Sequence, residues 1–241
     1  MSVLCYHSVT CGWDDPVSVE PDDFESQCTL LRATRTVVPL ASVKERLAGG
    51  QKLPARTAVL TFGDGFADFA EWAVPIMLRL GLPAAMYIVA GSVTEAGVPV
   101  NWIRGMEPSD APPLLEPAQI RELRRQGWEI GSHSMAHRDL PTLSEQECLA
   151  DLTESRELLS DLLGEHVDTL AYPFGRHAAH VRRAAERAGY TLAFALPEGP
   201  EEPGRFAVPR TGVYRGNERW KFLVKLQPWY APARRLVGSY R

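Results

Sequence analysis

Seven short apolar runs recur along the chain, separated by longer stretches in which apolar residues are spaced three and four apart. The short runs are rich in β-branched and aromatic residues, and several are almost continuously apolar, which is typical of strands buried on both faces of a parallel sheet. The predicted strands are Val3–Tyr6, Thr57–Phe62, Ala84–Val89, Trp128–Ser132, Val167–Tyr172, Thr191–Leu196 and Phe206–Arg210.

The stretches with three-and-four spacing predict amphipathic helices, and each is followed by a glycine, the residue that most readily adopts a left-handed helix cap. In the third of them Ser144 stands three residues before Glu147, the spacing of a capping box. The predicted helices and their glycines are Phe66–Leu80 with Gly81, Pro117–Gln126 with Gly127, Leu143–Leu163 with Gly164, and His177–Ala188 with Gly189.

Strands that alternate with helices predict an α/β fold, and a chain of 241 residues predicts a single domain. Periodicity alone leaves open whether the sheet is an open layer or a closed barrel. Two segments are predicted to be inserted loops, Gly91–Glu116 because it holds four prolines and Pro197–Gly204 because it is acidic and rich in turn residues. Such loops either shape a binding site at the strand ends or only cover the surface.

Composition narrows the function classes. With 26 basic and 30 acidic residues the net charge is −4, which gives no electrostatic basis for binding nucleic acid. The four cysteines lack CxxC spacing, so neither a disulfide scaffold nor a zinc knuckle is indicated. No apolar stretch approaches the roughly 18–20 residues that cross a bilayer, and Met1–Tyr6 lacks the basic start of a signal peptide. We therefore expect a cytoplasmic location.

Chemistry-bearing residues follow two of the predicted strands. Asp64 comes directly after the strand Thr57–Phe62, and His133 and His137 follow the strand Trp128–Ser132. If the histidine segment is helical, its two imidazoles share one face and can meet one ion. Two histidines and a carboxylate hold a divalent metal and leave positions open for water and substrate. Taken singly, Asp64 is as well explained by a turn or a helix cap.

Three motifs together resemble a known family. Thr61-Phe62-Gly63-Asp64-Gly65 is similar to TFDDG, His133-Ser134-Met135-Ala136-His137 matches H(S/T)xxH, and Ala171-Tyr172-Pro173-Phe174-Gly175 is similar to RxPYG. The chain thus resembles the polysaccharide deacetylases of carbohydrate esterase family 4, which carry the NodB-homology domain. Leu4-Cys5-Tyr6-His7-Ser8-Val9 resembles the YHxV segment of the branch whose catalytic histidine comes first. The resemblance implies a distorted (β/α)7-type barrel over residues 1–215.

The resemblance also implies the roles of individual residues in removing the N-acetyl group from an amino sugar or N-acetylated glycan. Asp64, His133 and His137 would hold a divalent metal, most simply Zn²⁺, with Co²⁺, Ni²⁺ or Mn²⁺ as alternatives. His7 would protonate the departing amine, and the backbone N–H of Phe174 would bind the oxyanion. Tyr172 and Pro173 would line the sugar cleft. Arg210, at the end of the last predicted strand, is expected to bind an anionic substrate group or to form an ordinary ion pair.

One position departs from the family pattern in a way that bears on activity. Gly63 stands where the first Asp of TFDDG serves as general base, and glycine has no side chain to accept a proton. Four explanations fit: a variant of an active enzyme, another base such as His7 or Asp68, a mechanism without a side-chain base, or a catalytically inactive carbohydrate-binding homologue on the same fold. A metal-free amidase fits less well, because both histidines and Asp64 are present.

The C-terminal segment, residues 216–241, mixes aromatic and basic residues, as in Trp220-Lys221-Phe222 and Trp229-Tyr230. Two interpretations stay open for it. It is either a helical extension packed on the barrel with its lysines reaching water, or an amphipathic helix that contacts a membrane surface and makes the protein membrane-peripheral. The sequence gives no indication of the oligomeric state.

Overall fold

Seven parallel strands close into a barrel. The computed structural model describes residues 1–48, 51, 54, 56–197 and 204–237. The strands lie in the order β1-β10-β9-β8-β7-β6-β5, and β5 pairs back onto β1, which closes the ring. All seven predicted strands and the barrel are therefore confirmed. Their bounds are β1 Ser2–Tyr6, β5 Thr57–Phe62, β6 Ala84–Ile88, β7 Glu129–Ser132, β8 Thr169–Ala171, β9 Leu192–Ala195 and β10 Val208–Gly212.

The barrel is distorted, because its strands are unequally paired. Five residue pairs join β1 to β5, whereas a single pair, Ser132 with Leu170, joins β7 to β8. Three further strands of two residues each lie outside the ring. The strand β4 (Thr36–Val37) pairs with the start of β5, and β2 (Ser8–Val9) pairs with β3 (Ser18–Val19) as a separate small sheet.

Alternate residues of each strand face the barrel interior and the surrounding helices, as the period of two requires. Val3 of β1 and Val59 of β5 belong to the interior cluster, which also holds Tyr87 and Phe194. Their neighbours Leu4, Leu60 and Met86 belong to the larger cluster under the helices. Because both faces are covered, the strands read as nearly continuous apolar runs.

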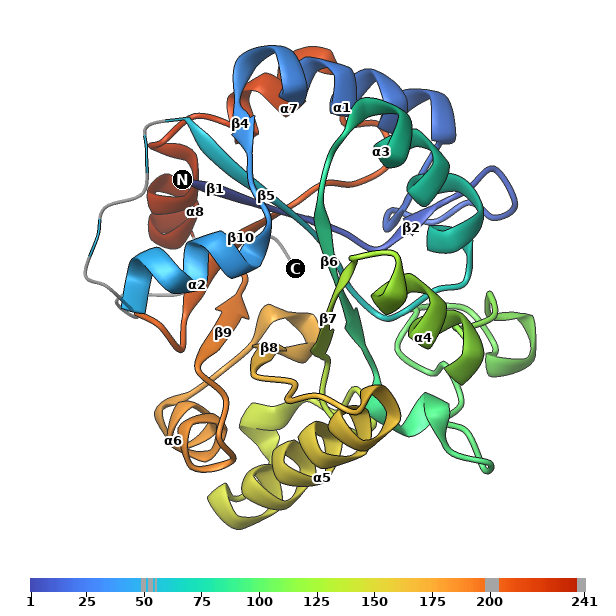
Figure 1. The fold of residues 1–241 in the computed structure, drawn as a ribbon, viewed down its shortest axis with the longest axis vertical. Coiled ribbons are helices and arrows are strands. Elements are labelled where there is room, and N and C mark those ends of the chain that lie inside the picture. The colour runs from blue at the N-terminus through green and yellow to red at the C-terminus, as the bar shows by residue number, and fades with distance from the viewer. Residues whose placement is uncertain (49–50, 52–53, 55, 198–203, 238–241) are drawn as a thin grey trace.

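Helices surround the barrel on all sides in Figure 1, with α1, α3 and α7 at the top of the view and α5 and α6 at the bottom. The predicted helix over 66–80 is divided: a π-helical turn at Phe69–Ala73 leads into α3, because Pro75 has no N–H to continue the regular ladder. The helices are α1 Pro21–Thr34, α2 Leu40–Ala48, α3 Val74–Leu80, α4 Pro117–Arg125, α5 Glu145–Leu163, α6 Ala179–Arg187, α7 Arg219–Lys225 and α8 Tyr230–Val237.

The predicted helix ends are confirmed. Gly81, Gly127, Gly164 and Gly189 all have positive φ. At the start of α5 the Glu147 N–H donates to Ser144 Oγ at 3.2 Å, and the Ser144 N–H donates to Glu147 Oε2 at 2.8 Å. The capping box therefore satisfies two backbone donors that the helix itself leaves unpaired.

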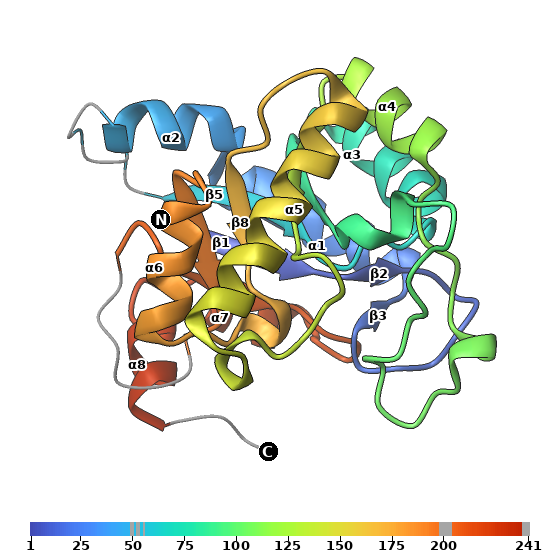
Figure 2. The ribbon, with the colours of Figure 1, turned by 90° about the horizontal axis from the view of Figure 1, so that it is seen from below.

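The segment 91–116 starts within a short 3-10 turn, Ala90–Val93, contains a second one, Pro108–Asp110, and lies beside the β2–β3 region in Figure 2. It is anchored by a separate hydrophobic cluster of Phe66, Val100 and Ile103, against which Trp13 and Trp102 pack. Of the other predicted loop, 197–204, residues 198–203 lie outside the described residues.

In the C-terminal segment, α7 buries Phe222, and Leu226 just after it is also buried, both within the large cluster that includes α1. Trp220 is 60% exposed and Trp229 57% exposed on the outer side. Residues 238–241 of the segment lie outside the described residues. Within the part of the chain that the structure describes, no helix is long and apolar enough to cross a membrane.

We expect Ser144→Ala to lower the free energy of unfolding by about 1 kcal/mol, because an exposed N-cap hydroxyl is lost. Urea denaturation followed by circular dichroism measures it. Ser144→Thr keeps the capping hydroxyl and should stay near the wild-type value; an equal loss in both variants would contradict the capping explanation.

Candidate active site

A cavity of about 460 Å³ opens at the carboxyl ends of the barrel strands. It is the place where active sites form in this class of barrel, because loops from several strands converge there. Loops after β1, β5, β7 and β8, together with the segment 91–116, supply its walls. The lining residues used below are Cys5, His7, Asp15, Asp64, Trp102, Arg104, His133, His137, Phe174 and Arg210.

Three potential metal ligands meet in this cavity, as predicted from their motifs. Asp64 Oδ1 lies 3.3 Å from the Nε2 atom of His133 and 3.3 Å from the Nε2 atom of His137. All three side chains are buried, and Asp64 Oδ1 has no hydrogen-bond partner among the described residues. One ligand atom from each residue falls within 4.8 Å of the others. Atoms arranged in this way fit a shared divalent cation, which would satisfy the orphaned carboxylate oxygen.

The protonation of His133 and Asp64 suits the binding of a cation. His133 Nδ1 lies 2.6 Å from the backbone oxygen of Ala171, which fixes the ring with its Nε2 atom toward Asp64. Such a second hydrogen bond orients a metal-binding imidazole. Burial lowers the pKa of His133 to about 4, so the ring is neutral at physiological pH. Burial alone would raise the pKa of Asp64, but the two facing imidazoles outweigh it and hold that pKa well below its usual range.

The segment between the two histidines forms tight turns, so the imidazoles do not meet through helical spacing. Ser134 has a φ of 67°, and its hydroxyl accepts a hydrogen bond from the His137 N–H at 3.1 Å. Asp151, from α5, accepts the Met135 N–H at 2.9 Å and pairs with Arg138 at 3.0 Å. The side chain of Asp151 is fully buried. Sequence reasoning missed Asp151, and only its place on the inner face of α5 could have indicated it.

Backbone strain is concentrated at this site. Five described residues other than glycine have positive φ, and four of them are Asp64, Ser134, His137 and Phe174. Each costs on the order of 1–3 kcal/mol and persists only where the surrounding structure holds it. The cavity is therefore a place where the fold imposes conformations that the residues do not favour on their own.

Aromatic rings wall the predicted metal site. Trp102, from the segment 91–116, stacks on His137 with ring centroids 4.5 Å apart, and the edge of Phe174 approaches the same imidazole at 4.6 Å. Phe174 is 42% exposed, so its ring faces the opening. The segment 91–116 thus shapes the cavity and does more than cover the surface.

The imidazole of His7 occupies the space beside Gly63. A Cβ atom on residue 63 would lie 2.9 Å from His7 Cδ2 and 3.3 Å from His7 Nε2, and 3.5 Å from His133 Nε2. The Nε2 atom of His7 also contacts Cys5 Sγ at 3.8 Å. Burial lowers the pKa of His7, but Cys5 and Asp64 outweigh it, and the pKa is raised above its ordinary value. Because Gly63 has no side chain, the His7 ring can lie in the space beside it.

The remaining predicted site residues divide into three that do not line the cavity, Tyr172, Pro173 and Asp68, and one that does, Arg210. Tyr172 points outward from β8, is fully buried against α6 and donates to the Phe206 backbone oxygen at 3.1 Å. Neither it nor Pro173 is among the described residues that line the cavity. Asp68 accepts a hydrogen bond from Ser8 and is likewise not part of the lining, although burial raises its pKa to about 6. Arg210 does line the cavity and is 2% exposed.

Comparisons with known proteins agree with this geometry. The family profile described as polysaccharide deacetylase matches residues 50–193. YxkH of Bacillus subtilis is 23% identical over 220 residues, covering 90% of this chain and 72% of the relative. The poly-β-1,6-N-acetyl-D-glucosamine N-deacetylase of Staphylococcus aureus is 24% identical over 221 residues, covering 86% of this chain and 71% of the relative.

Among solved structures, the deacetylase PplD of Streptococcus pyogenes, in complex with acetate, superposes with a TM-score of 0.78. It is 22% identical, and the match covers 95% of this chain and 98% of that chain. This likeness shows that the two chains share their fold across nearly their whole lengths.

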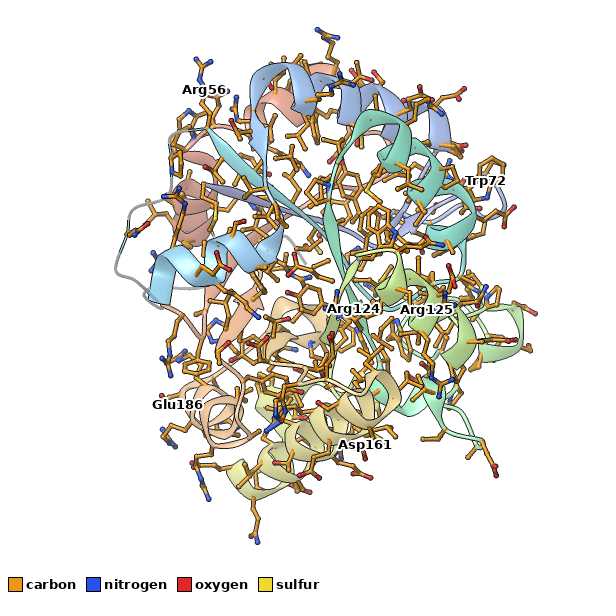
Figure 3. All side chains as sticks on the ribbon, viewed as in Figure 1. Arg56, Trp72, Arg124, Arg125, Asp161 and Glu186 are labelled. Atoms are coloured by element: carbon orange, nitrogen blue, oxygen red, sulfur yellow. The ribbon has the colours of Figure 1, made fainter. Side chains whose placement is uncertain are left out.

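We expect Asp151→Asn to weaken metal binding by about tenfold or more, because the turn between the two histidines loses its charged anchor. Zinc affinity, measured by competition with a chromogenic chelator, tests this. Asp161 lies on the outer face of the same helix (Figure 3), so Asp161→Asn is the matched control and should bind zinc like the wild type. Equal affinities in all three proteins would show that the anchor does not support the site.

Proposed function

Because the chain belongs to the polysaccharide deacetylase family, we propose that it is a metal-dependent hydrolase that removes the N-acetyl group from an amino sugar or an N-acetylated glycan. The observation that supports this most directly is the convergence of Asp64, His133 and His137 on one point of an open cavity. Hydrolysis of the amide would release acetate and a free amino group.

The metal is proposed from the donor set. Two imidazole nitrogens and one carboxylate oxygen suit Zn²⁺, and also Co²⁺, Ni²⁺ or Mn²⁺. When bound, such an ion supplies Lewis-acid polarisation of the acetyl carbonyl and acidifies a water molecule. The chain's own contribution is to orient His133 through the Ala171 carbonyl and to hold the turn between the two histidines through the Asp151 carboxylate.

Proton transfer is assigned to His7. The proposal places the imidazole next to the reacting water, since its ring fills the volume beside Gly63 and faces His133 across it. His7 would take a proton from the attacking water and deliver it to the leaving amine nitrogen, so that one residue acts first as base and then as acid. Asp68 is not a candidate base in this arrangement, because it bonds to Ser8 outside the cavity.

Substrate contacts are proposed for the aromatic walls and for the Phe174 backbone. Trp102 and Phe174 offer apolar faces at the cavity opening, which suit the C–H face of a pyranose ring. The N–H of Phe174 is proposed to donate to the oxyanion that forms when the acetyl carbonyl is attacked. The Staphylococcus aureus relative is named for a polymer of N-acetylglucosamine, and we propose the same class of N-acetylated glycan here.

A second function is favoured by one observation. Gly63 stands where the family pattern has a second catalytic carboxylate, and besides Asp64 the only carboxylate among the described residues lining the cavity is Asp15, whose Oδ1 accepts the Val17 N–H at 2.9 Å. A carbohydrate-binding homologue that recognises the glycan without hydrolysing it would show this pattern.

We expect acetate release from N-acetylglucosamine oligomers in the presence of Zn²⁺ or Co²⁺, detected by a coupled acetate assay. Asp64→Asn should lower the rate by about 100-fold or more, because polarisation by the metal contributes several kcal/mol. Asp15→Asn removes the other carboxylate of the cavity and should retain most of the rate. Oligomer binding without any acetate release, with every metal tried, would favour the binding homologue.

We expect Gly63→Ala to lower the rate by roughly tenfold or more, since the added methyl group displaces the His7 ring from its place. Zinc affinity should be unchanged, because the new Cβ lies at ordinary contact distance from His133. Gly204→Ala is the matched control, with nothing within 4 Å of its added Cβ. Full activity of Gly63→Ala would rule out His7, in this position, as the proton-transfer group.

A further inference from the structure

Arg210 is a buried cation in the cavity, and the residues that the structure describes give it no carboxylate partner. Arg210 is on the inward face of β10, is 2% exposed and lines the cavity. Its Nε and Nη1 atoms have no hydrogen-bond partner among the described residues. β10 pairs with β1 so that Arg210 stands opposite Val3, four residues before His7. The backbone of Arg210 is therefore deep in the barrel, and its long side chain forms part of the cavity floor.

A buried guanidinium normally has a partner, because removing an unpaired charge from water is costly. Within the described ranges no ion pair joins Arg210 to a carboxylate. Of the two lining carboxylates, Asp64 is held by His133 and His137, and Asp15 pairs with neither the guanidinium nor the metal ligands. The contact that Arg210 does make is with the ring of Tyr87, whose centroid lies 5.7 Å from the guanidinium carbon. At this distance the ring stabilises the charge but provides no hydrogen-bond acceptor for Nε or Nη1.

The charge of Arg210 shifts the pKa values of two nearby groups, Cys5 and His133. Burial raises the pKa of Cys5, yet Arg210 and His7 outweigh it, so that the pKa of the thiol is lowered. Arg210 also adds to the lowering of the pKa of His133. Arg210 thus acts as a positive charge on the groups around it in the cavity.

We propose that Arg210 is the anchor of a carboxylate-binding subsite on the floor of this cavity, separate from the metal ligands. The planar fork of a guanidinium matches the two oxygens of a carboxylate and can donate to both at once. A carboxylate bound through Nη2 and either Nε or Nη1 would give one of the unpaired donor atoms an acceptor and neutralise the buried charge. The inference concerns binding, and it rests on the proposed function only where the carboxylate is taken to be the acetate that hydrolysis releases.

Two sources could supply the carboxylate. Free acetate is small enough to reach a side chain that is almost fully buried, and the proposed reaction forms it in the same cavity. Alternatively, the carboxylate belongs to an acidic N-acetylated sugar, and Arg210 then selects among substrates. The depth of Arg210 favours the small free carboxylate.

Isothermal titration calorimetry of the metal-free protein with sodium acetate, at constant ionic strength, measures the dissociation constant of the subsite without requiring turnover. We expect acetate to bind and acetamide, its neutral analogue, not to bind. Arg210→Met should raise the dissociation constant for acetate roughly tenfold or more, because charge-assisted hydrogen bonds are lost. Arg104 lines the same cavity but is exposed, so Arg104→Met is the matched control and should leave the constant unchanged.

Arg210→Lys covers the case in which Arg210→Met does not fold. It keeps a positive charge inside the barrel but loses the fork, and it should bind acetate more weakly than wild type. The subsite is overturned if acetate binds only after zinc is added, or if it binds wild type and the Arg210 variant equally. It is also overturned if the protein binds acetate no better than acetamide and does not bind the acidic sugar described below.

The two sources are separated by titrating the acidic sugar glucuronate and its neutral counterpart glucose. Preference for glucuronate that depends on Arg210, without binding of free acetate, assigns the subsite to the substrate. Binding of acetate assigns it to the product. Because all titrations use metal-free protein, absence of deacetylation would leave this result standing, and failure of the subsite would leave the deacetylase proposal standing.

Discussion

The arrangement of the site depends on the pairing of the first strand with β5. Five residue pairs join β1 to β5, ending with Tyr6 opposite Phe62, and the Gly63 N–H donates to the Tyr6 oxygen at 2.9 Å. This pairing closes the barrel and brings the residue that follows β1, His7, beside the two that follow β5, Gly63 and Asp64. Without it, the N-terminal histidine and the metal ligands would have no fixed relation, because they are more than fifty residues apart in sequence.

The same pairing explains why glycine at position 63 matters for the site: it leaves room for the His7 ring. The imidazole of His7 lies where a side chain on residue 63 would begin. A carboxylate on the β5 loop and an imidazole in this position are therefore mutually exclusive unless one of them moves. Glycine in place of the family's aspartate removes a carboxylate at position 63 and leaves space beside it. The His7 ring occupies that space, so the effect of the substitution on the chemistry depends on what His7 does there.

Sequence patterns predicted the barrel strands, the capping box and the three metal-ligand candidates, because each depends on local spacing or on residues next to a strand end. They failed where long-range packing decides. The histidine segment forms left-handed turns held by Asp151 of α5, which no local motif reveals. Tyr172 faces the helices because β8 alternates and the inward place belongs to Ala171. The contact of Arg210 with the cavity depends on how β10 aligns with β1, which periodicity does not encode.

The segment 91–116 is anchored by its own hydrophobic cluster around Phe66, apart from the clusters inside and outside the barrel. Phe66 lies only two residues after Asp64, and the Leu115 N–H donates to the Gly65 oxygen at 2.8 Å, so the segment that carries Trp102 is anchored on the same loop as Asp64. Insertions or substitutions elsewhere in this segment can change the shape of the cavity wall, whereas changes at its contacts with Phe66 would also disturb the loop that carries Asp64.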